Sequence, residues 1–253
     1  MTIVFTGVLP RQLIVMTVDS AVTNYLEDRR EYVTGRKAYG FPGVGCVTTW
    51  GARNQNRIGE FLAKQSISPA THSVHKLADL VYYYLTTEYR PRELDLEDVG
   101  YHVAGFDQNR QACFPHIFWG IDRPGIDEPK VQEYRRYEEP LYNQKNSLFY
   151  SGRNDLTEVV VRTLLRQVVR DDETRYRLAL PVELACFSDF VARFAAELTP
   201  EVGPPFLTYL ITPNNQMKQV KNDSFCPIGG DNIAKELIAL GYPNPTYKTQ
   251  SRS

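Results

Sequence analysis

Residues 2–19, TIVFTGVLPRQLIVMTVD, contain two apolar runs, Ile3–Leu9 and Gln12–Val18, separated by a Pro-Arg pair. A two-residue break between apolar runs of this kind is typical of a tight hairpin. Because apolar residues are nearly continuous along both runs, we expect both faces of the resulting sheet to be covered. The segment therefore predicts a buried hairpin that begins next to Thr2 and ends at Asp19.

The rest of the chain alternates between blocks of strands and blocks of helices. Apolar residues recur at helical spacing over Arg53–Lys64, His72–Tyr89, Leu156–Val169 and Pro181–Leu198, and a short helix is expected from Asp231 to Leu240. Strand-like runs cover Val44–Thr49, Gly100–Phe106, Gln111–Ile121, Leu148–Tyr150, Phe206–Thr212 and Met217–Val220. This order differs from the strict alternation of a doubly wound fold, so it favours an α+β layered domain.

The domain organisation follows from where the pattern is interrupted. No linker divides the chain, so we expect a single domain over residues 1–242 and a flexible tail over residues 243–253, which are rich in Pro, Thr and Ser. Residues 122–144 are charged and contain three prolines. We expect this stretch to be an excursion on the surface of the domain.

Composition is that of an average globular protein, with 253 residues, a net charge of −1, 42% hydrophobic and 23% charged residues. Balanced charge argues against nucleic acid as a partner, and no apolar run reaches the roughly 18 residues of a membrane-spanning helix. The four cysteines include no C-x-x-C pair, and the first residues lack a positively charged leader. We therefore expect a cytoplasmic protein with reduced thiols and no membrane partner.

Thr2 is the sharpest candidate for chemistry. Cleavage after Met1 would free its α-amino group, whose unperturbed pKa of about 7.7–8.0 suits a base near neutral pH, beside its own nucleophilic hydroxyl. Many proteins begin Met-Thr by chance, so the case for a catalytic Thr2 depends on Asp19 and Lys37. A Thr/Asp/Lys cluster would stabilise the charge formed during attack. The alternative is that Asp19 ends a strand and Lys37 is solvated.

Other candidates depend on local geometry. Gly51 lies where a strand gives way to a helix, and its N–H could stabilise an oxyanion, although a glycine chosen for its dihedral freedom is the alternative. His72, His75 and Asp79 share a spacing that could place metal ligands on one helix face, but a solvated face is favoured. His102 and His116 are expected to be ordinary residues of strands.

Thr2-Ile3-Val4, Asp19-Ser20, Arg36-Lys37 and the Gly51 turn, in this order and spacing, resemble the N-terminal-nucleophile (Ntn) hydrolases of the proteasome β-subunit type, and in particular their bacterial homologues. The resemblance covers about residues 2–220 and includes the stretches Gly105-Phe106-Asp107, Trp119-Gly120-Ile121-Asp122, Tyr150-Ser151-Gly152 and Val202-Gly203-Pro204-Pro205. It implies a four-layer αββα sandwich. It also implies that Thr2 is nucleophile and base, that Asp19 and Lys37 tune it, that Gly51 donates to the oxyanion and that Ser151 supports the terminal amine.

One part of the family pattern is absent. Where an Asp followed three residues later by Ser is expected, this chain has Thr199-Pro200-Glu201-Val202. Glu201 is the candidate supporting acid, and Asp171 with Thr174 is a lower-ranked alternative.

The resemblance implies a threonine-type peptidase or amidohydrolase that needs no metal or organic cofactor. It further implies peptide or protein substrates and self-association into a ring or spiral, and it leaves an ATPase partner open. Two alternatives stay open as well. One is a non-catalytic proteasome-like subunit for assembly or partner binding, and the other is a self-contained amidase for a small molecule.

Overall fold

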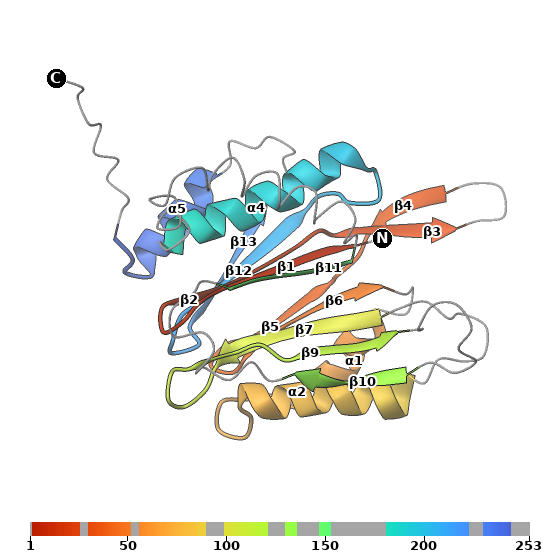
Figure 1. Cartoon of the computed structure of the whole chain (residues 1–253), viewed down its shortest axis with the longest axis horizontal. Coiled ribbons are helices and arrows are strands. Elements are labelled where there is room, and N and C mark those ends of the chain that lie inside the picture. The colour runs from red at the N-terminus through yellow and green to blue at the C-terminus, as the bar shows by residue number, and fades with distance from the viewer. Residues whose placement is uncertain are drawn as a thin grey trace.

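The computed structural model describes residues 2–25, 30–51, 56–89, 99–120, 130–135, 147–152, 181–222 and 230–243. Two antiparallel sheets form the body of this part of the chain (Figure 1). The first has the order β11-β1-β2-β12-β13, made of Ser147–Gly152, Ile3–Leu9, Leu13–Val18, Phe206–Ile211 and Met217–Asn222. The second has the order β10-β9-β7-β6-β5, made of Lys130–Arg135, His116–Gly120, Val99–Phe106, Gly45–Gly51 and Ala38–Phe41.

Three short strands lie outside these two strand orders. β8 (Ala112–Cys113) pairs with the end of β7, and β3 (Ala21–Tyr25) forms a separate hairpin with β4 (Arg30–Thr34). The N-terminal hairpin is confirmed. β1 and β2 pair from Val4↔Val18 to Leu9↔Leu13, and every residue of both strands is buried, as the continuous apolar runs predict.

Helices cover the outer faces of the two sheets (Figure 1). α4 (Pro181–Leu198) and α5 (Gly230–Ala239) pack on the first sheet, where Leu184 and Leu237 join a core cluster with Leu13. α1 (Asn56–Lys64) and α2 (Val74–Tyr83), which continues into the π-helical segment η2 (Tyr84–Tyr89), pack on the second sheet. A further core lies between the sheets. No helix in the described ranges is long and apolar enough to cross a membrane.

Most expected elements are confirmed, with three differences. The polar stretch after β2 forms the β3–β4 hairpin, which the sequence did not predict. The run Gln111–Ile121 is divided into β8 and β9, with Pro115, which lacks an N–H for the ladder, between them. Residues 122–144 contribute β10, which pairs with β9. The helix expected over Leu156–Val169 and the tail from residue 244 onward lie outside the described residues.

Candidate active site

A buried ion pair joins the end of β2 to the start of β5. Lys37 Nζ lies 3.1 Å from both carboxylate oxygens of Asp19, and the same ammonium donates to the Ala21 carbonyl. Asp19 and Lys37 are 0% and 1% exposed. The carboxylate also accepts hydrogen bonds from the N–H groups of Ile3 (2.9 Å), Ala21 (3.1 Å) and Gly203 (3.4 Å). Each buried charge is therefore compensated, as its burial requires.

Burial sets the electrostatics of this pair. It lowers the pKa of Lys37, and the charge of Asp19 opposes that shift. Burial likewise raises the pKa of Asp19, opposed by the charge of Lys37 and by the backbone N–H donors. Because removal of either partner would leave an uncompensated buried charge, the two side chains depend on each other.

Thr2 is held beside the ion pair by its own neighbour, since the Ile3 N–H is the donor to Asp19. On the other side, β11 pairs with β1 in the register Ile3↔Gly152 and Val4↔Ser151. Gly152 has a φ of +100°, and a Cβ atom there would lie 1.8 Å from the Thr2 carbonyl oxygen. Only glycine fits at this position, so β11 fixes the backbone of Thr2 closely.

A second buried hydrogen-bond network links β7 of the second sheet to β1 and β11 of the first. His102 of β7 makes hydrogen bonds through Nε2 to the Ser151 hydroxyl (2.8 Å) and through Nδ1 to the Thr6 hydroxyl (2.9 Å). Burial, together with the neighbouring His116, holds the pKa of His102 well below its usual value, so the ring is neutral. A neutral imidazole has one donor and one acceptor nitrogen, so His102 links the orientations of the two hydroxyl groups.

The sequence did not predict the role of His102, which we expected to be an ordinary strand residue. Its only signal was a polar side chain inside an apolar strand that is buried along its whole length. The ion pair between Asp189 and Arg193, one turn apart and buried on α4, was missed as well.

Gly51 and Glu201, two further predicted residues, each lie two residues along the chain from a backbone contact with the pair. Gly51 ends β6 with a φ of +98°, two residues after Thr49, whose N–H donates to the Lys37 carbonyl (2.9 Å). Glu201 is 6% exposed in the loop between α4 and β12, two residues before Gly203, which donates to Asp19. Asp171, the lower-ranked acid, lies outside the described residues.

A cleft of about 550 Å³ lies between the β3–β4 hairpin and the loop after α4. Its lining includes Ala21 and Gly203, whose backbones contact Lys37 and Asp19, whereas Thr2 is not among the lining residues. Asp19 therefore connects the Thr2 end of β1 to the loop that borders the cleft.

Comparison with known proteins identifies solved structures that share this fold. No family model and no curated protein matches the chain. Among solved structures, it is similar to a Gly-1 mutant of Anbu from Hyphomicrobium sp. strain MC1, with a TM-score of 0.54 and 13% identity over 95% of this chain and 97% of the other. It is also similar to Anbu, described as an ancestral beta-subunit, from Yersinia bercovieri, with a TM-score of 0.53 and 12% identity over 95% of this chain and 96% of the other. The chain therefore has the proteasome β-subunit-like fold that its sequence resemblance implied.

Proposed function

We propose that the chain is a threonine-type Ntn hydrolase, which cleaves peptide or amide bonds once the bond between Met1 and Thr2 has been cut. One observation carries the proposal. The Asp19 carboxylate binds the Lys37 ammonium and the Ile3 N–H together, so a buried cation is fixed next to the residue that would bear the free α-amino group.

In the proposed reaction the Thr2 hydroxyl attacks the substrate carbonyl, and the free α-amino group of Thr2 accepts the hydroxyl proton. The Gly51 N–H donates to the oxyanion that forms. The carbon–nitrogen bond then breaks, and the leaving amine takes the proton from the Thr2 amine. Water hydrolyses the resulting Thr2 ester, which regenerates the enzyme. The positive charge of Lys37 lowers the proton affinity of the hydroxyl, and Asp19 holds Lys37 in place.

Ser151 is proposed to support the terminal amine, and His102 to act as a positioning residue through Ser151. The network from Thr6 through His102 supports this role, because it restricts the direction of the Ser151 hydroxyl on the strand that pairs with β1. A neutral His102 suits the task, since a positive charge on the ring that binds Ser151 would disfavour protonation of the Thr2 amine during attack. Glu201 is proposed as the supporting acid on the loop that reaches Asp19.

The same proposal includes the architecture and the assembly. Helices on the outer faces of two facing sheets support a four-layer αββα sandwich of the Ntn type. Copies of the chain would associate through their helical layers into a ring or spiral that encloses the sites. Peptides or unfolded proteins are the proposed substrates.

The test compares two forms of the protein, one that starts at Met1 and one released from a cleavable fusion so that it starts at Thr2. Because Thr2 is only 3% exposed and its amine is blocked in the uncut chain, only the second form should hydrolyse fluorogenic peptides. A Thr2→Ala variant of that form is the matched control. Equal activity in the Thr2→Ala variant would refute the proposal.

One observation favours a second function, a non-catalytic proteasome-like subunit. The Asp-x-x-Ser acid of the family pattern is replaced here by the Glu201 segment. A Thr2-start form that assembles into a closed oligomer without hydrolysing peptides would support this alternative. A stable monomer that hydrolyses small amides would instead support a self-contained amidase.

A further inference from the structure

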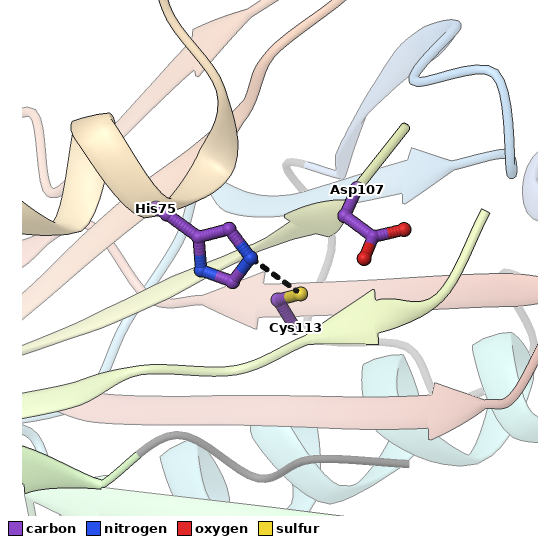
Figure 2. Close-up of side chains that lie close together, drawn as sticks. All are labelled: His75, Asp107 and Cys113. Atoms are coloured by element: carbon purple, nitrogen blue, oxygen red, sulfur yellow. Dashed lines mark hydrogen bonds between the residues drawn. The ribbon is translucent and has the colours of Figure 1, made fainter. Parts of the chain in front are cut away.

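Three potential metal ligands meet where α2 begins against the end of β7. His75 lies in the first turn of α2, Asp107 directly follows β7, and Cys113 ends β8 (Figure 2). β8 pairs with β7 through Gly105↔Cys113, which brings the cysteine next to the helix. One ligand atom from each residue lies within 4.8 Å of the others. This group differs from the set of His72, His75 and Asp79 that helical spacing suggested.

The separation of His75 and Cys113 fits two ligands of a tetrahedral cation. His75 Nε2 and Cys113 Sγ are 3.6 Å apart. Zinc bonds of roughly 2.3 Å to sulfur and 2.0–2.1 Å to nitrogen, separated by a tetrahedral angle, hold their two ligand atoms about 3.6 Å apart. A metal ion can therefore enter between the two side chains with little change in their separation.

The turn between β7 and β8 holds the carboxylate of Asp107 in place. Its Oδ1 accepts hydrogen bonds from the N–H groups of Asn109 (2.8 Å) and Gln111 (2.9 Å), which close the turn between β7 and β8. The turn does not use the second oxygen of the same carboxylate. His75, Asp107 and Cys113 are each partly exposed, so a cation can reach them and water can fill a fourth position.

The charge and the softness of these three ligands also suit a divalent transition-metal ion. An imidazole, a thiolate and a carboxylate suit a borderline-soft divalent ion, and hard ions such as Mg²⁺ prefer oxygen alone. One thiolate and one carboxylate neutralise a charge of +2. The thiol proton is released to solvent when the metal–sulfur bond forms.

We propose that His75, Asp107 and Cys113 bind a divalent cation of the Zn²⁺ class, with water as the fourth ligand. The bound ion clamps the start of α2 to the β7–β8 turn. This site lies at the opposite end of β7 from Val99, which pairs with Gly51, so the length of the strand separates them by roughly 23 Å. The cation site is thus independent of the proposed hydrolase function.

The test titrates Co²⁺ and then competing Zn²⁺ into the full chain after treatment with a chelator. We expect one Co²⁺ per chain, tetrahedral d–d absorption and a thiolate-to-cobalt charge-transfer band that Zn²⁺ removes. Cys113→Ser should abolish the charge-transfer band, and His75→Gln should weaken binding at least about 100-fold, since even the loss of a residue behind the ligands costs 10–100-fold.

Control variants separate a metal site from incidental binding or misfolding. Cys186→Ser changes a half-buried cysteine on α4, and His72→Gln changes the histidine three residues before His75, so both variants should bind Co²⁺ like the unmodified chain. Asp107→Asn keeps an acceptor for the turn but loses the charge, so the protein should fold normally and bind at least about tenfold more weakly. Absence of the charge-transfer band in the unmodified chain, or binding that is unchanged in Cys113→Ser, would overturn the proposal.

Discussion

Gly152 gives the most direct structural test of how the Thr2 end of β1 is held. A Cβ atom at residue 152 would lie 1.8 Å from the Thr2 carbonyl oxygen, whereas ordinary contacts of Cβ atoms begin near 3.4 Å. Gly152→Ala must therefore push β11 away from β1 by more than an ångström at the Ile3↔Gly152 pair, or else displace Thr2.

Gly241 is a matched control for the backbone conformation. It has a φ of +90°, close to the +100° of Gly152, but nothing lies within 4 Å of a Cβ atom built there. Ala at either position costs about 1–2 kcal/mol for the left-handed conformation. At Gly152 the loss of about two ladder hydrogen bonds adds roughly 2 kcal/mol. We expect a total of about 3–4 kcal/mol for Gly152→Ala and about 1–2 kcal/mol for Gly241→Ala.

The assay is urea denaturation of both variants, followed by circular dichroism and by tryptophan fluorescence, with the free energy of unfolding extrapolated to water. A Gly152→Ala variant no less stable than Gly241→Ala would show that β11 does not confine Thr2. The geometric basis of the proposed site would then be wrong.

Three further predictions concern buried charges and the histidine network. Lys37→Met should lower the free energy of unfolding by about 3–5 kcal/mol, because it leaves the buried Asp19 charge without its counter-ion. The double variant Lys37→Met/Asp19→Asn should recover part of that loss, as measured by urea titration. Burial lowers the pKa of His116 to about 4 and that of His102 well below its usual value, so the unfolded chain binds more protons below about pH 6.5. Stability should therefore fall as the pH drops from 6.5 towards 4, by about 3 kcal/mol from His116 alone, and urea midpoints of His116→Gln should depend less on pH. Finally, His102→Gln should slow peptide hydrolysis by the Thr2-start form about tenfold but have little further effect in Ser151→Ala, and additive effects would contradict a role through that hydroxyl.

The sequence was most informative where one local property decides the structure. Continuous apolar runs predicted the β1–β2 hairpin and its burial on both faces. The β3–β4 hairpin was missed because charged residues such as Arg30 and Glu31 dominate the stretch between its apolar positions, and because it pairs outside the two main sheets.

The candidate site was predictable to the extent that residue type sufficed. Asp19 and Lys37 were identified because an acid and a cation in apolar surroundings need each other, and the structure joins them. His102 could not be identified in this way, since its partners are 49 and 96 residues away and meet it only when the two sheets pack. The cluster of His75, Asp107 and Cys113 depends on helix–sheet packing for the same reason.

The central claim is that Thr2, once its amine is free, is the nucleophile of a site organised by Asp19 and Lys37. Intact mass spectrometry after treatment with a peptide epoxyketone tests it most directly. We predict a single covalent adduct that maps to Thr2 in the form that starts at Thr2, and none in the form that retains Met1 or in Thr2→Ala. A Thr2-start form that folds normally and acquires no adduct, or an adduct that persists in Thr2→Ala, would contradict the account.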